Sequence, residues 1–173
     1  MNPNFSIGQI QDITIPPSWE EHFEERERAV PFTMRYFHPQ DDENAMLAFF
    51  YRGRRLDKVN GEKFRKVLES PAHVLNQHEF EDLRAVLRDK NDPEEFQVVI
   101  AKTEDFNGKR VLIIEGRYLG IAEDNRHMFI DSDGTGTAVQ EVFYQAHRSI
   151  FPRFYKAAAG AMRTIKWKER APV

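Results

Sequence analysis

The chain has 173 residues, of which 40% are hydrophobic and 31% charged, so it can bury the core of one globular domain, expected over residues 1–173, and is too apolar to be disordered. It contains no cysteine, which excludes disulfides, thiol catalysis and thiolate zinc sites, and its net charge of −3 is small. No apolar run approaches the roughly 20 residues of a membrane-spanning helix, and the N-terminus lacks the basic start and apolar stretch of a secretory signal, so the expected location is cytoplasmic.

The beginning of the chain predicts a strand followed by a helix. The run 13–15 is apolar and is closed by two prolines, which indicates the end of a first strand. Ser18 and Glu21 have the spacing of a capping box, in which each side chain accepts a backbone N–H of the other residue. A short helix is therefore expected to begin at Ser18 and to end at Pro31.

Two strands are expected next. Residues 32–37 alternate between apolar and polar side chains, which is typical of a half-buried strand. Residues 45–51 form a continuous apolar run, which indicates a strand buried on both faces. The basic stretch 52–55 is expected to leave the sheet.

Two helices are then expected, each marked by apolar residues three or four positions apart. The first ends at Pro71, and its apolar residues are Phe64, Val67 and Leu68. The second begins with a capping box made by Asn76 and Glu79. Its apolar stripe consists of Phe80, Leu83, Val86 and Leu87.

The C-terminal half alternates strands and turns. Strands are expected at 96–102 and 111–119, joined through Asn107-Gly108, a residue pair that tolerates positive φ in a hairpin. A second hairpin is expected from strands at 126–130 and 138–144.

A helix and a short last strand are expected to close the chain. The apolar residues of the helix are Phe151, Phe154, Tyr155, Ala158 and Met162, and the strand covers 164–167. This order of elements excludes a parallel nucleotide-binding sheet. The predicted fold class is α+β: one domain with an antiparallel sheet of about six to seven strands flanked by helices.

Charge is distributed unevenly along the chain. Residues 1–45 hold nine acidic and three basic side chains, whereas residues 146–173 hold seven basic and one acidic. Two interpretations stay open: two solvated faces that touch each other in the fold, or a basic patch that binds an acidic partner. The candidate interaction surface consists of Arg148, Arg153, Lys156, Arg163, Lys166 and Lys168. A pI near 6.1 makes nucleic acid the weaker choice of partner.

One string resembles a catalytic motif. Residues 129–135 are similar to the first motif of the haloacid dehalogenase superfamily, in which an aspartate nucleophile ends an apolar strand. The resemblance implies Asp131 as nucleophile, Asp133 as general acid/base and a divalent cation beside them. In that superfamily the motif opens the first strand of a parallel sheet, whereas here it lies inside a hairpin near the C-terminus. Phosphatase activity is therefore the minor hypothesis.

The same string nearly matches a calcium-binding loop. Asp131, Asp133 and Gly136 fall at positions one, three and six, but Val142 stands where a bidentate glutamate is needed. A wide β-turn explains these residues better. None of the six histidines pairs with another at a spacing of four, and they are His22, His38, His73, His78, His127 and His147. No metal site and no cofactor is predicted.

Three short stretches carry a resemblance to the Mog1/PsbP-like group of proteins. Residues 15–19, Ile-Pro-Pro-Ser-Trp, resemble the early strand-Pro-x-Trp entry of that group. Asn107-Gly108-Lys109 with the long strand after it resembles its central hairpin, and 151–167 resembles its closing helix and strand. The resemblance implies an antiparallel sheet between helices and a scaffold used to bind proteins. It implies no catalytic set.

The favoured hypothesis is a non-enzymatic adaptor or chaperone-like module that binds another protein through an acidic surface of that partner. One alternative is a Mg²⁺-dependent hydrolase that uses Asp131 and Asp133. Another is a small-ligand-binding protein with a concave sheet, for which the candidate lining residues are Phe49, Tyr51, Ile114, Tyr118, Phe129 and Tyr144.

Overall fold

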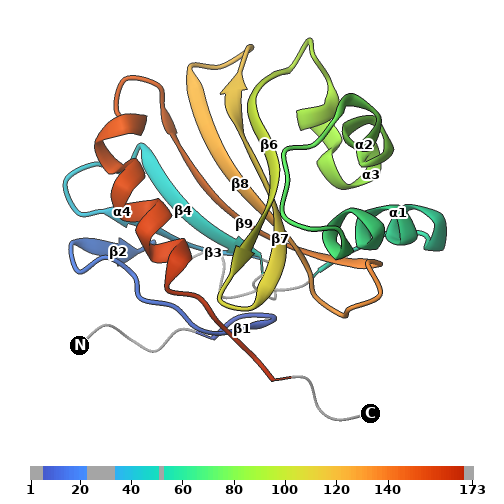
Figure 1. The fold of residues 1–173 in the computed structure, drawn as a ribbon. Helices are drawn as coiled ribbons and strands as arrows, with labels where there is room; N and C mark the ends of the chain where they lie inside the picture. Colours follow the sequence, from blue (N-terminus) through green and yellow to red (C-terminus); the bar gives the residue numbers. More distant parts are fainter. Residues whose placement is uncertain (1–5, 23–33, 51–52, 170–173) are drawn as a thin grey trace, which may run out of the picture.

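The fold is built on an antiparallel eight-stranded sheet. A computed structural model describes residues 6–22, 34–50 and 53–169. The strand order is β2-β3-β4-β9-β8-β7-β6, and β5 pairs with β9 beside β4 (Figure 1). The strands of this sheet are β2 (Trp19–Glu21), β3 (Met34–Pro39), β4 (Ala45–Phe50), β5 (Arg54–Arg55), β6 (Phe96–Phe106), β7 (Lys109–Tyr118), β8 (Glu123–Asp131) and β9 (Ala138–His147). β1 (Ile10–Asp12) and β10 (Lys166–Trp167) form a separate two-stranded ribbon.

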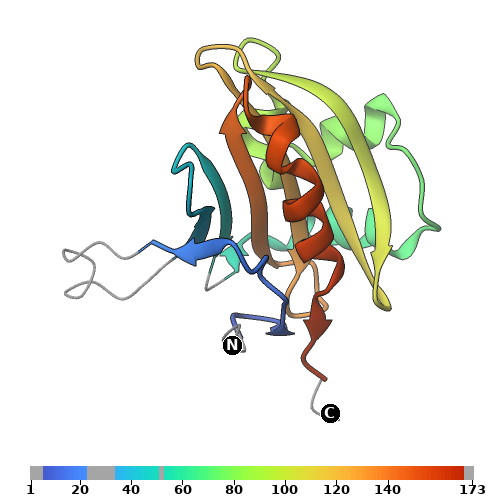
Figure 2. The same cartoon turned by 90° about the vertical axis from the view of Figure 1, so that its left-hand side faces the viewer.

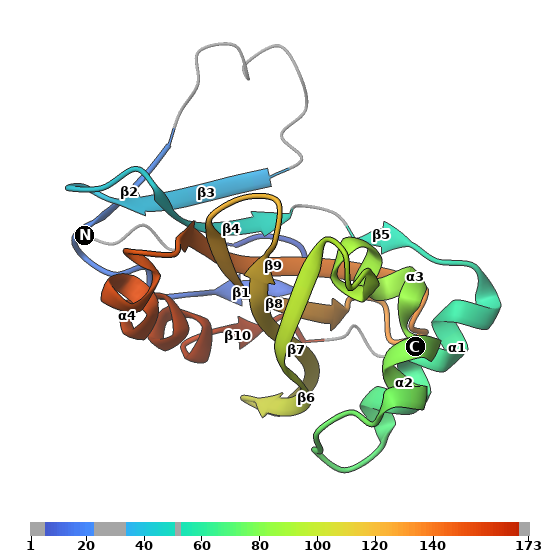
Figure 3. The ribbon, with the colours of Figure 1, turned by 90° about the horizontal axis from the view of Figure 1, so that it is seen from above.

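Helices cover both faces of the sheet, so the molecule has three layers. One face is crossed by α4 (Phe151–Arg163), which lies in front of the strands in Figure 2. The other face carries α1 (Lys58–Glu69), α2 (Gln77–Asp82), α3 (Arg84–Leu87) and the 3-10 helix η2 (Arg88–Asn91). Seen from above, β2 and β6 lie at opposite ends of the sheet (Figure 3). This is the α+β sandwich that the sequence predicts.

Each face has its own apolar core. The core under α4 consists of the apolar side chains of that helix, including Phe154 and Met162, together with the N-terminal isoleucines. On the opposite face Phe64 of α1 and Leu83 meet Leu112 of β7. The spacing of three and four that predicted α1 and α4 is therefore the pattern of side chains that these helices bury.

The N-terminal segment is held against the sheet by one amide. The side chain of Gln140 is fully buried, and its Nε2 donates to Ile7 O at 3.0 Å and to Phe50 O at 3.2 Å. Its Oε1 accepts the backbone N–H of Gln9 at 2.9 Å. Since a buried amide must satisfy its own polar atoms, these contacts fix where residues 7–9 lie.

The central hairpin is formed as its turn residues predict. Asn107 and Gly108 have φ angles of 48° and 87°, which is the left-handed conformation of a two-residue hairpin turn. The side chain of Asn107 donates to Ile165 O at 2.7 Å, which ties the turn to the chain end.

Two expectations for the N-terminal region are wrong. Residues 13–15 lie outside any strand, and the first strand is β1. Trp19 and Glu21 lie in β2, not in a helix, because Trp19 packs between Tyr144 and Phe154 at ring distances of 6.4 and 6.2 Å. Burial of an indole overrides a local capping pattern. The expected helix end at Pro31 and the residue Tyr51 lie outside the described residues.

Two further expectations need correction. Arg54 and Arg55 do not leave the sheet but pair with β9 as β5. The second predicted helix is divided into α2 and α3, because Leu83 has ψ of 13° between them, and Arg88 with φ of 55° ends α3. The capping box of Asn76 and Glu79 is present as expected.

Candidate binding site at the edge of β6

Because β6 ends the sheet, one of its sides has no neighbouring strand of the sheet. The segment 73–75 covers half of that side. Leu75 N–H donates to Ala101 O at 2.9 Å, and Thr103 N–H donates to His73 O at 2.8 Å. The chain therefore already adds a short strand-like segment to this edge.

The first half of β6 keeps its outer side open. Leu119 N–H donates to Glu95 O at 2.9 Å, so the backbone carbonyl of residue 95 faces β7. Farther along, the pairing register of β6 with β7 shifts between Val98 and Ile100. Backbone directions alternate along a strand, so this bulge leaves both Val98 and Val99 facing outward. In the part of the chain that the structure describes, no segment pairs with the outer side of β6 at these two residues.

The bulge depends on a glycine in the neighbouring strand. Gly116 lies opposite Val98, and a Cβ atom there would come within 2.2 Å of Gln97 O and 2.5 Å of the ring of Phe96. Any larger residue at this position would push β6 away from β7. Gly116 therefore allows the irregular backbone of the open stretch.

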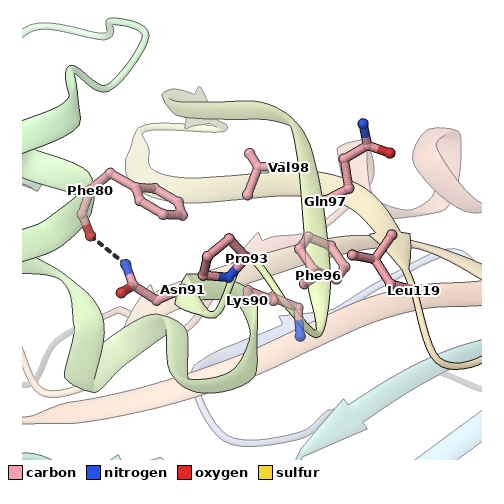
Figure 4. Close-up of a pocket in the computed structure, with 8 residues that line it drawn as sticks. All are labelled: Phe80, Lys90, Asn91, Pro93, Phe96, Gln97, Val98 and Leu119. Carbon is pink, nitrogen blue, oxygen red and sulfur yellow. Dashed lines mark hydrogen bonds between the residues drawn. The ribbon is translucent and has the colours of Figure 1, made fainter.

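An apolar pocket of about 480 Å³ opens beside that stretch (Figure 4). Phe80 of α2 and Val98 of β6 point toward the same hollow in this view. The side-chain amide of Asn91 donates to Phe80 O at 2.9 Å and holds η2 against α2. The lining residues are Phe80, Lys90, Asn91, Pro93, Phe96, Gln97, Val98 and Leu119. Apolar walls with a few polar groups are typical of a binding pocket.

Exposed apolar side chains gather along the same edge. Among the described residues, five large hydrophobic side chains are mostly exposed, and they are Val59, Val74, Val99, Leu119 and Ile121. Val74 bridges to Lys102 of β6, Val99 lies in the bulge, and Leu119 is bonded to Glu95. Three of the five therefore lie on or next to one strand. Apolar side chains that are exposed together in this way indicate an interaction surface, whereas single scattered ones do not.

A second hollow with a basic wall adjoins the pocket. Its volume is about 350 Å³, and its lining residues are Arg84, Arg88, Asn91, Asp92 and Pro93. Asn91 and Pro93 also line the apolar pocket. Arg84 and Arg88 are both exposed, and neither forms an ion pair with a carboxylate in the described chain. Arg84 Nε donates only to the neutral Asn91 side chain, at 3.2 Å.

Beneath the pocket lies a buried ammonium group. The side chain of Lys90 is 4% exposed, and its Nζ donates to Tyr118 Oη at 3.0 Å. Tyr118 in turn donates to Asp89 Oδ2 at 3.0 Å. Burial lowers the pKa of Lys90, while the carboxylate of Asp89 opposes that shift. This network fixes η2, so that the aliphatic stem of Lys90 forms part of the pocket wall.

A second polar group fixes α3. Arg54 donates to Ala85 O and Val86 O, both at 2.5 Å, and to Glu141 Oε1 at 2.9 Å. Burial raises the pKa of Glu141, but the nearby imidazole of His127 and the hydrogen-bonded guanidinium of Arg54 outweigh burial and bring that pKa to about 2. Arg54 thus joins β5, β9 and the last carbonyls of α3, which explains why residue 54 stays in the sheet.

His127 lies in the same interior. It is 5% exposed and stacks on Phe129 at 4.3 Å and Phe143 at 5.2 Å between ring centres. Its Nε2 is 3.5 Å from Glu141 Oε2. Burial lowers the pKa of His127 to about 4, so the ring is neutral near pH 7.

The carboxylates of the catalytic-looking string serve the loop itself. Asp131 ends β8, between antiparallel neighbours, and its Oδ1 accepts Gly134 N–H at 2.9 Å. Asp133 Oδ1 accepts the N–H and the hydroxyl of Thr135, at 2.9 and 2.7 Å. Burial raises the pKa of Asp131. The hydrolase hypothesis requires a parallel strand at Asp131, and the antiparallel sheet contradicts it. The predicted wide turn between β8 and β9 is confirmed.

Metal-binding side chains do not gather elsewhere in the described ranges. Within residues 6–22, 34–50 and 53–169, no three His, Asp or Glu side chains are placed to hold a metal ion. His73 contributes to the edge segment, since its Nε2 lies 2.9 Å from Glu79 Oε1. His22 stacks on Tyr36 at 4.7 Å. His73 and His22 thus each contact a neighbouring side chain of the fold.

The predicted basic surface is spread along the length of α4 and its flanks. Arg148 precedes the helix and pairs with Asp124 at 3.0 Å. Lys166 follows the helix and pairs with Asp12 at 3.6 Å. Arg153 pairs with Asp41, and Arg163 with Glu104, while Lys156 and Lys168 are exposed. Asp12 and Asp41 belong to the acidic N-terminal part, so the two charged regions do touch each other. That the surface binds a partner stays a prediction.

The residues proposed to line a concave ligand-binding sheet are divided between the two cores. Phe49 and Tyr144 are buried under α4, whereas Ile114 and Phe129 are buried under α1–α3. Tyr118 packs against the second group. The described members of the set therefore do not line one common cavity.

The edge site was not predicted from the sequence. The apolar run 98–100 and the exposed Leu119 in a glycine-containing loop are signals that could indicate it. Lys90 and Arg84 carry no local signal, because their roles depend on where η2 packs against β6.

No protein-family model and no curated protein matches this chain by sequence. Solved structures do. One is the solution structure of cyanobacterial PsbP (CyanoP) from Synechocystis sp. PCC 6803, with 8% identity, coverage of 94% of this chain and 95% of that one, and a TM-score of 0.52. Another is LpqN, involved in cell envelope biogenesis of Mycobacterium tuberculosis, with 18% identity, coverage of 90% and 82%, and a TM-score of 0.48.

The comparison with CyanoP covers nearly the whole of both chains, although the identity of 8% limits the likeness to the fold. The resemblance predicts an antiparallel sheet with helices on either side, and the structure has both. As a separate finding, none of the helices in the described ranges has the length and apolar character of a membrane span. The fold of this chain is that of the Mog1/PsbP-like group.

Proposed function

We propose that this chain is a non-enzymatic protein-binding module that holds a segment of its partner at the open half of β6. The observation that carries the proposal is the position of the pocket: an apolar hollow of about 480 Å³ lies directly beside outward-facing backbone at Val98 and Val99. Strand edges of this kind bind extended peptides, since main-chain hydrogen bonds supply affinity and the adjoining pocket supplies specificity.

The use of the acidic side chains supports a non-enzymatic role. Asp131 and Asp133 accept hydrogen bonds within their own loop. Glu141 is buried with Arg54 and His127. These are structural duties, and none of the three carboxylates lines the pocket.

Affinity capture tests the proposal. The immobilised full chain is exposed to extracts of cells that make it, in parallel with Leu119→Asp, which places a charge at the pocket rim. Val59→Asp is the matched control, because Val59 is 63% exposed in α1 and does not line the pocket. We expect one stoichiometric partner with the wild-type chain and the control, and its loss with Leu119→Asp. A partner that persists with Leu119→Asp and is lost with the double variant Arg153→Glu, Lys156→Glu would place the interface on α4 and overturn the proposal.

A further inference from the structure

We infer that the segment bound at β6 is short and extended, and that it carries an apolar side chain next to carboxylates. This inference rests on the proposed function and adds the chemistry of the partner. It follows from three separate features of the edge: the length of its open stretch, the pocket beside it and the basic hollow that adjoins the pocket.

The length of the open stretch limits the occupant. At one end Phe96 N–H already donates to Asp92 O at 2.9 Å, and at the other Ala101 O already accepts Leu75 N–H. Only residues 97–100 remain between these bonds, a length of about 13 Å. Edge-to-edge pairing with a second copy would need a longer regular strand, and the bulge at Val98–Val99 opposes it. A short peptide segment fits.

The pocket selects an apolar side chain. Next to the open backbone lie Phe80, Pro93 and Val98, and Leu119 closes the rim (Figure 4). A strand added to β6 alternates its side chains, so every second one points toward the α1–α3 side of the sheet, where the pocket lies. An apolar group there would cover Leu119, which is 52% exposed.

The basic hollow selects negative charge next to that side chain. Arg84 and Arg88 lie beyond Asn91 and Pro93, the two residues shared by both hollows. The only carboxylate in the hollow is Asp92, and its Oδ1 already accepts Glu94 N–H at 2.9 Å. Arginine binds carboxylates through paired N–H groups. Two guanidinium groups that form no ion pair in the described chain, beside an apolar pocket, therefore favour a segment with acidic residues next to its apolar anchor.

Selection of peptides tests the inference. A library of short random peptides is selected against the full chain, and the enriched peptides are synthesised for anisotropy titrations at low and high salt. We expect apolar residues adjacent to Asp or Glu, and binding about tenfold weaker to the double variant Arg84→Gln, Arg88→Gln. The control is Lys58→Gln, Arg65→Gln, which removes two charges from α1. Peptides with Gln in place of the acids should bind the wild type and the double variant equally.

Amide hydrogen exchange supplies a readout of strand addition. Bound peptide should slow exchange at Val98 and Val99 and leave Val59 unchanged. Enriched peptides without acidic residues, or an equal affinity for the double variant, would overturn the acidic preference. If capture of the natural partner still depends on Leu119 in that case, the proposed function stands and only its refinement fails. Peptides that bind without protecting Val98 and Val99 would overturn strand addition itself.

Discussion

Arg88 joins α3 to η2 with φ of 55° and ψ of −121°, a conformation that glycine adopts freely and that costs an L-residue about 1–3 kcal/mol. It is also one of the two arginines of the basic hollow. Strained backbone is often kept where a side chain is needed for function. Arg88 therefore combines a strained backbone with a side chain of the proposed binding surface.

Replacement of Arg88 by glycine is therefore expected to stabilise the fold. Arg88→Gly should raise the free energy of unfolding by about 1 kcal/mol, since relief of strain exceeds the extra entropy that glycine gives the unfolded chain. Urea unfolding measures the change. Arg84→Gly is the matched control, because Arg84 lies in α3, where glycine lowers stability by about 1 kcal/mol. An Arg88→Gly chain less stable than wild type would show that the strain is absent.

Gln140 is the residue on which the N-terminal segment depends. Gln140→Ala should lower the free energy of unfolding by about 3 kcal/mol, because it leaves the bonding partners at residues 7, 9 and 50 without their amide. Gln77→Ala, at an exposed glutamine of α2, should change it by less than about 0.5 kcal/mol. Urea unfolding of both variants checks the difference, and equal effects would contradict the assigned role.

His127 makes stability depend on pH. Its pKa is about 4 in the folded chain and 6.5 when unperturbed, so the unfolded chain binds the proton first as the solution is acidified. The contribution of the neutral His127 ring to the free energy of unfolding is complete above pH 6.5. It is lost as the pH falls from 6.5 through 4, and the total loss is about 3 kcal/mol. The charged groups near the ring are Glu141, Lys90 and Asp89. Glu141, with a pKa of about 2, loses its contribution at lower pH.

The measurement is the free energy of unfolding between pH 7 and pH 4. His127→Phe keeps an aromatic ring between Phe129 and Phe143 and should flatten the profile over this interval. His78→Gln, at an exposed histidine of α2, should leave the slope as in wild type. A steep profile in the His127→Phe chain would show that another group controls the acid response.

Single elements show why some parts of the fold can be predicted and others cannot. The β6–β7 hairpin follows from Asn107-Gly108, because turn chemistry is local. That β6 ends the sheet depends on strand order, which no local pattern encodes. The capping pattern at residues 18–21 predicts a helix where β2 forms for the same reason: Trp19 is positioned by Tyr144 and Phe154, far away in the chain. The edge site, which needs α2, η2 and β6 together, could not be located from sequence.

The bulge of β6 yields a prediction at the scale of the element. Gly116→Ala should lower the free energy of unfolding by about 1–3 kcal/mol and weaken peptide binding, because its Cβ atom would collide with Gln97 O. Gly120→Ala is the control, since no atom lies within 4 Å of a Cβ atom built there. Thermal unfolding and anisotropy titration measure the two effects. A fully stable Gly116→Ala chain would contradict the close packing of β6 on β7.

At the scale of the whole molecule, the fold separates two surfaces with different character. The face of α4 carries exposed ion pairs between the basic end and the acidic beginning of the chain, such as Arg153 with Asp41. Exposed pairs of this kind contribute about 0–1 kcal/mol and are screened by salt. The β6 edge instead combines apolar exposure, open backbone and unpaired arginines. The basic side chains at the end of the sequence thus largely form ion pairs within the fold. The surface that we propose for binding is the edge of β6.

The proposed function also implies that the acidic string has no hydrolytic role. Wild-type chain and Asp131→Asn should both leave p-nitrophenyl phosphate with Mg²⁺ at the background rate, since the carboxylates serve their own turn. Hydrolysis by the wild type that vanishes in Asp131→Asn would restore the hydrolase hypothesis.

Photo-crosslinking in living cells tests the binding surface most directly. A photoreactive phenylalanine is placed in turn at Leu119, at Val59 and at Lys156, all of them exposed. We predict one crosslinked partner at Leu119 and none at Val59 or Lys156. A partner captured from Lys156, with nothing captured from Leu119, would contradict binding at the β6 edge.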